Sequence, residues 1–229
     1  EVGIAAVFVD AEAPGWSSVA IDDLAGGELA TGHLLDLGHR RIGFIGDPED
    51  NAFGFTSSHL RRQGYRRALE ARGVAVDSGM ERTGPHGRQT AAALAEELLD
   101  SAETPTAIFA ASDTQALGVL DAAARRGRAV PGDLSVIGFD DIEAAEYAGL
   151  TTVRQPLALS GLEAAQLLQA QMRDPGREPE RIELPLELVL RRTTVPLGAG
   201  GDPDPADHAN DTTRAVERAD RRGKQDEHR

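Results

Sequence analysis

The stretch Ala107-Ile108-Phe109-Ala110-Ala111-Ser112-Asp113 is an apolar run that ends at an aspartate. Three other runs of the chain share this pattern, at residues 7–10, 42–47 and 136–141. Continuous apolar runs of this length are typical of strands that are buried on both faces, as in a parallel sheet covered by helices. Open α/β sheets bind ligands beyond the carboxyl ends of their strands, so aspartates repeated at that edge indicate a small-molecule binding protein.

Strand-like and helix-like segments alternate from residue 6 to about residue 140. After the run at 7–10, strands are expected at 17–21, 41–46, 80–83, 107–111 and 135–139. Helices are expected at 23–37, 56–72, 88–102 and 113–126. Thr56, Ser57 and Ser58 offer N-caps for the second helix, and the pair Ser112 and Gln115 has capping-box spacing before the fourth. This alternation predicts βαβ crossovers and a parallel sheet of the α/β class.

The chain becomes less regular after residue 141. A short helical piece through Tyr147 precedes an extended segment at 151–156, an amphipathic helix at 158–173 and an extended run at 181–190. Beyond Pro196 the sequence is rich in Gly, Asp and Arg and has almost no large apolar side chains. Such a segment cannot bury enough surface to offset the entropy of ordering, so residues 197–229 are expected to be disordered.

The composition limits the classes of function. The 229 residues carry 38 acidic and 24 basic side chains and a net charge of −14, whereas a nucleic-acid surface normally shows a basic excess. The absence of cysteine excludes disulfides, thiolate metal sites and thiol nucleophiles. No secretory signal follows Glu1 and no apolar run reaches the ~20 residues of a membrane helix, which favours a cytoplasmic protein. The chain begins without Met, so it is expected to be a piece of a longer protein.

Enzyme signatures were sought and none is present. The sequence contains no Walker A loop, G-x-S-x-G elbow, G-x-G-x-x-G turn, H-E-x-x-H helix or calcium loop. The six histidines form no ligand pair at i, i+4 spacing. We therefore expect a binding protein that is not an enzyme and needs no cofactor or metal.

Polar residues at the expected strand ends are the first candidates for ligand contacts. Ser112 and Asp113 could cap the helix that follows them, contact a ligand, or do both. Asp140 and Asp141 hold the same position without a strong helix start behind them, which favours a ligand role. Arg61 lies early in a helix, where a positive charge opposes the macrodipole. That charge needs an offset from acidic partners or from a ligand.

Aromatic and basic motifs leave further alternatives open. Phe53 and Phe55 lie in a polar loop and form either a small core or a wall of the pocket. Trp16, the only tryptophan, could provide a stacking surface. The motif Gly38-His39-Arg40-Arg41 is either an anion site or a helix C-cap with basic groups at the negative end of the dipole, and the second interpretation is favoured.

Several motifs in one order resemble the lactose/galactose-repressor (LacI/GalR) family of bacterial transcription regulators. The resemblance extends from residue 6 to about 195. Residues 34–42, for example, read Leu-Leu-Asp-Leu-Gly-His-Arg-Arg-Ile, and residues 133–141 read Asp-Leu-Ser-Val-Ile-Gly-Phe-Asp-Asp. Further matching motifs are found at 64–65, 105–107, 112–118, 150–156 and 191–194. Each motif is modest alone, but so many in one order are highly specific.

The resemblance implies a periplasmic-binding-protein-like fold, in which two Rossmann-like lobes close on a sugar-like or nucleoside-like effector. Residues 23–156 with 185–196 would form a complete C-terminal lobe. Residues 1–22 with 157–184 would form only part of the N-terminal lobe. Operator DNA would be bound through an N-terminal helix-turn-helix that is absent from this chain.

The family's ligand contacts match Asp10, Arg61 and Asp140, and His86 falls near another contact position. With the candidates above, the predicted ligand-binding residues are Asp10, Phe53, Phe55, Arg61, His86, Ser112, Asp113 and Asp140. The chain departs from the family pattern at Ser112, where asparagine is common, and at Leu157, where many members have an aromatic residue. Charged groups combined with hydroxyls favour a polyol or sugar ligand.

The resemblance also implies a homodimer through the helix at 113–126, with Leu117 central, and through the piece near Tyr147. Spacing alone equally allows Leu117 to be part of an ordinary helix-to-sheet core. The solute-binding protein of an ABC transporter shares the implied fold and is the alternative function. An α/β enzyme is a third class, for which the sequence provides no nucleophile or metal motif.

Overall fold

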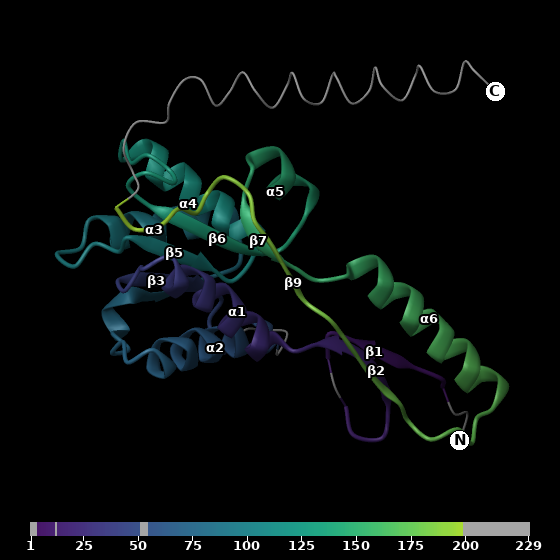
Figure 1. The fold of residues 1–229 in the computed structure, drawn as a ribbon. Helices are drawn as coiled ribbons and strands as arrows, with labels where there is room; N and C mark the ends of the chain where they lie inside the picture. The colour runs from purple at the N-terminus through teal and green to yellow at the C-terminus, as the bar shows by residue number, and fades with distance from the viewer. Residues whose placement is uncertain (1–3, 12, 51–54, 199–229) are drawn as a thin grey trace, which may run out of the picture. The chain divides into compact units, whose positions relative to one another are not determined.

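The computed structural model describes residues 4–11, 13–50 and 55–198. In these residues the strands form two separate sheets (Figure 1). The smaller sheet has the order β1-β2-β8 and is parallel; its strands are β1 (Val7–Val9), β2 (Ser17–Ile21) and β8 (Arg181–Leu184). The larger sheet has the order β4-β3-β5-β6-β7-β9; its strands are β3 (Ile42–Gly46), β4 (Glu81–Thr83), β5 (Ala107–Ala110), β6 (Ser135–Asp140), β7 (Thr151–Arg154) and β9 (Glu187–Val189). Only β9 is antiparallel to its neighbour within this described sheet.

Helices cover both faces of the larger sheet (Figure 1). The described helices are α1 (Asp23–Asp36), α2 (Ser57–Ala71), the 3₁₀ turn η1 (Ser78–Met80), α3 (Arg88–Leu99), α4 (Asp113–Arg125), α5 (Glu143–Ala148) and α6 (Leu157–Arg173). Because successive strand residues point to opposite faces, Phe44 and Phe109 pack with α1 and α2. Their neighbours Ile45 and Ile108 pack with α3 and α4. A strand with apolar residues on both faces is what the continuous runs predicted.

The expected strands and helices between residues 7 and 140 are confirmed, with small differences at their ends. Gly38 and Gly127 follow two of the helices with φ of 91° and 63°, a conformation that glycine adopts at little cost. Ser112 caps α4, since its Oγ accepts a hydrogen bond from the Gln115 N–H at 3.2 Å. Thr56 holds the N-cap position of α2, as predicted, but its side chain makes no cap bond. Ser58 instead uses its Oγ to accept the Asp47 N–H at 2.8 Å.

The run at 181–190 is not one strand. Residues 181–184 pair in parallel with β2 in the smaller sheet, whereas residues 187–189 pair antiparallel with β7 in the larger one. Pro185 lies between the two strands. Proline has no N–H to donate to a ladder, so it interrupts the pairing at the point where the chain changes sheets.

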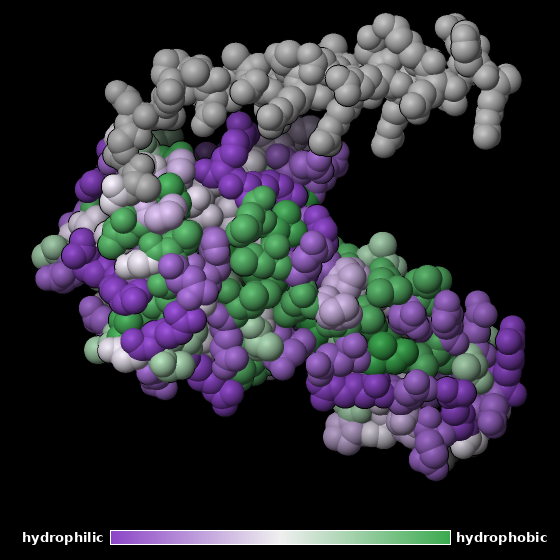
Figure 2. Space-filling model, viewed as in Figure 1, coloured by the Kyte–Doolittle hydropathy of each residue, from purple (hydrophilic) through white to green (hydrophobic). Residues whose placement is uncertain are grey.

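Helix α6 packs on the smaller sheet and leaves much of its apolar surface uncovered. Only Ser160 and Leu167 of this helix are buried. Leu157, Leu162 and Met172 are exposed, and Figure 2 shows apolar surface over this helix. None of the described helices is long and apolar enough to cross a membrane.

The segment after β9 is fastened to the larger sheet by buried polar side chains. His39, which is only 2 % exposed, hydrogen-bonds through Nδ1 to Thr106 Oγ1 and through Nε2 to the Val195 carbonyl, both at 3.0 Å. Arg40 donates to the Leu35 carbonyl at the end of α1, as expected of a C-cap. The Leu197 N–H donates to the Leu37 carbonyl. The remainder of the segment predicted to be disordered, residues 199–229, lies outside the described residues.

Two glycines allow α1 and α2 to pack in backbone contact. A Cβ added at Gly27 would overlap the carbonyl oxygen of Arg61, and one added at Gly64 would overlap the carbonyl oxygen of Leu24. The atoms in the way belong to helix backbone, which cannot rotate aside as a long side chain can. The two helices can therefore approach this closely only because neither glycine has a side chain.

We predict that Gly64→Ala destabilises the fold although alanine is the better helix former. The overlap should cost about 1–3 kcal/mol of unfolding free energy or more. Gly32→Ala is the control, because Gly32 is a helix-interior glycine of the neighbouring α1 and a Cβ added there meets nothing within 4 Å. That variant should gain roughly 0.5–1 kcal/mol. Urea denaturation of both variants measures the difference, and equal stability of the two would show that the helices are not in close contact at Gly64.

Candidate functional site

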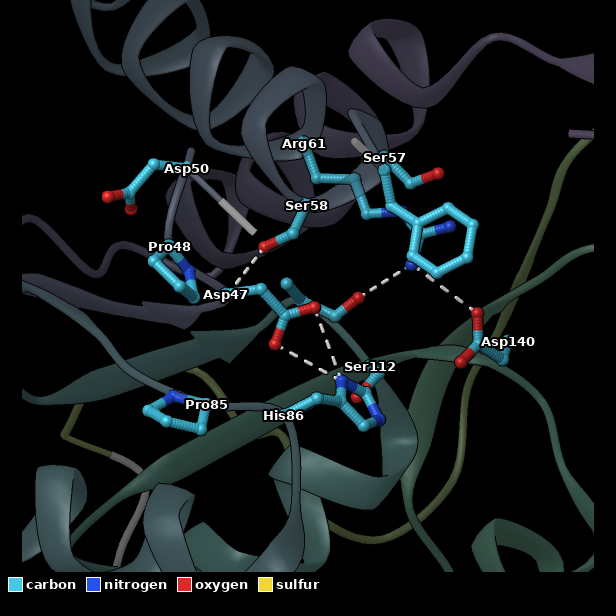
Figure 3. A pocket seen from close by; sticks show the side chains of 12 residues that line it. Asp47, Pro48, Asp50, Ser57, Ser58, Arg61, Pro85, His86, Ser112 and Asp140 are labelled. Atoms are coloured by element: carbon cyan, nitrogen blue, oxygen red, sulfur yellow. Dashed lines mark hydrogen bonds and ion pairs between the residues drawn. The ribbon is translucent and has the colours of Figure 1, made fainter. Parts of the chain in front are cut away.

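A cavity of about 640 Å³ lies at the carboxyl ends of β3, β5 and β6 (Figure 3). Its volume is in the usual range of small-molecule sites. The lining residues come from the turns that follow these three strands, from the start of α2 and from the turn before α3: Asp47, Pro48, Asp50, Phe55, Ser57, Ser58, Arg61, Pro85, His86, Ala111, Ser112 and Asp140. The cavity is thus at the sheet edge where the aspartate-terminated runs indicated a binding site.

Arg61 is the most constrained side chain of the cavity wall. It projects from α2 and is only 6 % exposed. Its Nε donates to Asp23 Oδ1 at 2.7 Å, and its Nη1 donates to the Ala111 carbonyl at 2.7 Å and to Asp140 Oδ1 at 3.4 Å. The guanidinium carbon lies 3.6 Å from the centre of the Phe139 ring. These acidic partners supply the offset that a positive charge near a helix start requires.

The turn after β6 holds two aspartates in an unusual backbone conformation. Asp140 has φ of 112° and Asp141 has φ of 58°, values that cost a non-glycine residue of order 1–3 kcal/mol each. Gln155 donates to Asp140 Oδ1 at 2.6 Å. Asp141 instead accepts from Arg154 at 2.7 Å and pairs with Arg191 at 2.7 Å. The sharp turn therefore sends two consecutive carboxylates in different directions, and only Asp140 lines the cavity.

Burial affects the acidity of the Asp140 carboxyl group. Removal from water raises its pKa, and the nearby Asp23 acts in the same direction. Arg61 and the hydrogen bond from Gln155 act in the opposite direction without cancelling the effect of burial. A ligand hydroxyl that donates to Asp140 would stabilise the charged form.

A second polar group centres on Asp47, a residue that the sequence analysis did not select as a ligand contact. Gln115 donates through Nε2 to Asp47 Oδ1 at 2.9 Å. His86 Nδ1 lies 3.1 Å and 3.2 Å from the two carboxylate oxygens (Figure 3). His86 and Asp47 both line the cavity. The apolar run at 42–47 contained the signal, because Asp47 directly follows β3 and Asp140 is the last residue of β6.

Four further kinds of lining residue were not predicted from the sequence as ligand contacts: Ser57, Ser58, Asp50 and the prolines. Ser57 and Ser58 were read only as helix caps. Their position at the start of a helix that begins beside the sheet edge was an available signal, as it had been for Arg61. Asp50 and the prolines follow from loop geometry, which the sequence pattern does not encode.

The other predicted ligand residues differ in their placement. Ser112 lines the cavity and is 6 % exposed, and it also caps α4. Phe55 lines the cavity with 68 % of its surface exposed. Asp10 is not among the lining residues; it has φ of 53°, and burial together with Asp23 raises its pKa while Arg61 opposes that shift. Phe53 lies outside the described residues.

Asp113 is predicted as a ligand contact, but the structure places it inside the fold. It is fully buried, its Oδ1 accepts from Thr152 at 2.6 Å and its Oδ2 accepts from the Ile142 N–H at 2.9 Å. A Cβ added at Gly138 would overlap the same Oδ1, so the carboxylate occupies the space above that glycine. Contact with a ligand in the cavity does not fit this geometry. The helix start turns the neighbouring Ser112 toward the cavity and Asp113 toward the sheet.

The two predicted dimer residues are both at the surface of the larger sheet's helices. Leu117 is half-buried on α4. Tyr147 on α5 is 79 % exposed, and its hydroxyl donates to Glu143 at 3.2 Å. Leu117 is therefore not a fully buried core residue, and Tyr147 presents an aromatic ring to the outside.

The fold and the cavity define a small-molecule binding domain of the α/β class, with its site at the carboxyl edge of a parallel sheet. Comparison with known proteins identifies the family. The chain belongs to the periplasmic-binding-protein-like domain family, whose model matches residues 31–194. The relatives it matches are LacI-type transcriptional regulators.

Two of these relatives are named as helix-turn-helix-type transcriptional regulators. The chain is 40% identical over 179 residues to the transcriptional regulator CelR of Thermobifida fusca, covering 77% of this chain and 52% of the relative. It is 37% identical over 182 residues to the repressor CytR of Escherichia coli K12, covering 79% of this chain and 52% of the relative. The chain thus spans about half the length of the curated relatives it matches.

Solved structures show the same likeness. A LacI family regulator from Enterococcus faecium with bound ribose aligns with a TM-score of 0.76 and 32% identity, covering 83% of this chain and 70% of that one. A complex of CelR with cellobiose aligns with a TM-score of 0.75 and 36% identity, covering 82% of this chain and 58% of that one. The predicted periplasmic-binding-protein-like fold and the LacI/GalR resemblance are confirmed.

The buried carboxyl group of Asp113 should make the stability of the fold depend on pH. Burial raises the pKa of Asp113 to about 7, although its hydrogen bonds from Thr152 and Ile142 act against this rise. The unfolded value is about 4, so the folded protein takes up a proton that the unfolded chain releases, and the resulting stability is lost as pH rises toward 7. We predict that the unfolding free energy of the wild type relative to Asp113→Asn falls by about 2–3 kcal/mol between pH 5 and pH 8.

Urea denaturation at the two pH values measures this difference. Asp121→Asn is the control, because Arg88 lowers the pKa of the surface residue Asp121 and keeps its titration below this window. The difference between the wild type and Asp121→Asn should therefore be the same at pH 5 and pH 8. An equally constant difference for Asp113→Asn would show that Asp113 does not titrate near neutrality.

Proposed function

We propose that this chain is the effector-sensing part of a LacI-type transcriptional regulator. In this proposal a sugar-like or nucleoside-like molecule binds in the cavity around Arg61, and binding controls attachment to operator DNA by a helix-turn-helix elsewhere in the protein. The observation that carries the proposal is the cavity at the strand ends, with a buried arginine in its wall, in a chain whose matched relatives are regulators. Ligand-driven closure would shift the protein between two states of different operator affinity.

The chemistry of the wall supports a hydroxyl-rich ligand. Asp47, Asp140 and Ser112 offer oxygen atoms that accept hydrogen bonds from hydroxyls. Phe55 offers an apolar surface on which a sugar ring or a base can rest. The solute-binding protein of an ABC transporter is the alternative with the same fold. The regulators among the relatives favour the first function.

Binding without chemical conversion is part of the proposal. The pair of His86 and Asp47 resembles the base and orienting acid of a hydrolase. In the described part of the chain, however, no hydroxyl is hydrogen-bonded to Nε2 of His86. Ser112 Oγ accepts from the Gln115 N–H and lies 3.2 Å from its amide oxygen. The hydroxyl thus caps a helix, and we propose that it does not act as a nucleophile.

Ligand affinity should depend on the guanidinium of Arg61. We predict that Arg61→Lys, which keeps the charge but loses the planar fork, weakens effector binding by about 1.5–3 kcal/mol. Asp140→Asn should weaken it by a similar amount. The measurement is calorimetry on the full-length protein, with an effector found by screening sugars and nucleosides. Arg62→Lys is the control, since Arg62 pairs with Glu49 and does not line the cavity. Unchanged affinity in the first two variants would contradict the proposal.

We further propose a cytoplasmic homodimer that uses α4 and α5. Tyr147 and Leu117 present apolar surface on these helices, and like surfaces on two copies can pair about a two-fold axis. We predict that Tyr147→Asp combined with Leu117→Asp converts the dimer to a folded monomer, because the charges would be buried unpaired at the interface. Light scattering gives the mass, and circular dichroism shows whether the variant is folded. A monomeric wild type would refute the interface.

A further inference from the structure

The cavity holds an excess of negative charge that its single arginine does not neutralise. Among the described lining residues, the carboxylates are Asp47, Asp50 and Asp140, and the only Arg or Lys is Arg61. Nε and Nη1 of Arg61 are already directed at Asp23, Asp140 and the Ala111 carbonyl. A phosphate or carboxylate on a ligand would therefore meet a guanidinium whose charge is already paired with two protein carboxylates. Asp10 adds to the same field, since it interacts electrostatically with both Asp23 and Arg61.

The Asp47 carboxylate is held in place at the cavity wall by contacts with two neighbouring side chains. One of its oxygens accepts from Gln115, and both lie close to His86 Nδ1. Its backbone N–H donates to Ser58 Oγ. Its side chain nevertheless remains 27% exposed to the cavity side of this network. Figure 3 shows the Asp47 carboxylate directed toward His86 and Ser112, whereas the Asp50 carboxylate points away from these groups.

Besides Arg61, the start of α2 is a feature of the described wall that attracts anions. A helix amino terminus has a partial positive charge of about half a unit. Asp47 is hydrogen-bonded to the first turn of this helix through Ser58 and contributes a full negative charge beside it. Two further carboxylates line the same cavity. The sum of these charges disfavours an anionic ligand.

We propose that the cavity selects ligands that have no phosphate or carboxylate group, and that Asp47 is a specificity-determining residue for this choice. The inference rests on the proposed function and deepens it, because it narrows sugar-like and nucleoside-like effectors to the uncharged or cationic ones. Hydroxyl or ammonium groups donate to Asp47 and Asp140, whereas a phosphate monoester offers mainly acceptors to a wall of acceptors. Free sugars and nucleosides therefore bind, and their phosphate esters are rejected.

The test uses matched pairs of compounds on the full-length protein. Each pair is a parent compound and its phosphate monoester: ribose and ribose 5-phosphate, glucose and glucose 6-phosphate, adenosine and adenosine 5′-monophosphate, within a wider panel built in the same way. Thermal shift identifies the pairs that bind, and calorimetry measures both affinities. We expect the phosphate ester to bind at least about tenfold more weakly than its parent, since each uncompensated charge at close range has an effect of this size.

Two variants assign the effect to Asp47. Asp47→Asn keeps an oxygen to accept from Gln115 but removes the charge, so it should narrow the gap between the two members of a pair at least about threefold. Asp121→Asn removes the same charge from a surface residue that pairs with Arg88 and does not line the cavity, and should leave the gap within about twofold. Circular dichroism confirms that both variants are folded.

The possible outcomes distinguish a failure of the inferred selectivity from a failure of the proposed function. The inference is supported if the parent compounds bind and their esters do not. Measurements on the wild type alone are enough to show this. Esters that bind as tightly as their parents, or more tightly, overturn the inference and leave the proposed function intact. A gap that is unchanged in Asp47→Asn overturns the role of Asp47. If no compound of either kind binds, the proposed function itself is refuted.

Discussion

The burial of one guanidinium organises much of this domain. Arg61 must be met by carboxylates and carbonyls because an unpaired cation in the interior costs several kcal/mol or more. Its partners come from three elements: Asp23 from α1, the Ala111 carbonyl after β5, and Asp140 at the end of β6. These groups can converge only if α1 and α2 lie in backbone contact, which Gly27 and Gly64 allow. A Cβ added at Gly27 would overlap the backbone of Arg61 itself. The packing of the two helices and the position of the Arg61 side chain therefore depend on each other.

Three aspartates at strand ends have strained backbone conformations, and one of them, Asp140, lines the cavity. Asp10, Asp140 and Asp141 all have positive φ, and each lies at or just after the end of a strand. A continued strand would place alternate side chains on opposite faces of the sheet, away from its edge. The left-handed conformation turns the backbone and lets Asp140 reach Arg61 while Asp141 reaches Arg154 and Arg191. Such strain persists only where other contacts fix the backbone, and the ion pairs on both sides provide those contacts.

Much of the fold was predictable from the sequence because its elements are long and periodic. Three of the four apolar runs gave the adjacent strands β3, β5 and β6 of the larger sheet, whereas the run at 7–10 gave β1 of the smaller sheet, which is only partly buried. Glycines at the helix ends gave the limits of the helices. The ligand set was less predictable, since adjacent polar residues at a strand end point to different places. Ser112 faces the cavity and Asp113 faces Gly138 and Thr152, a distinction set by packing space rather than by residue type. Pro185 was a local signal for the break between β8 and β9, but which sheet each half joins is decided by tertiary contacts.

The cavity and the surface of α5 are joined through a short and well-bonded path. Asp140 lines the cavity, and two residues later the N–H of Ile142, the N-cap of α5, donates to the buried Asp113. Between them, Asp141 is held by Arg154 and Arg191. A rigid connection of this kind transmits displacement because none of its members can move without breaking a bond to a neighbour. In the proposed function, a ligand that draws Asp140 into the cavity would displace Ile142, the N-cap of α5, whose exposed surface includes Tyr147. Effector binding and the proposed dimer contact would then be coupled by three consecutive residues of one turn, Asp140 to Ile142.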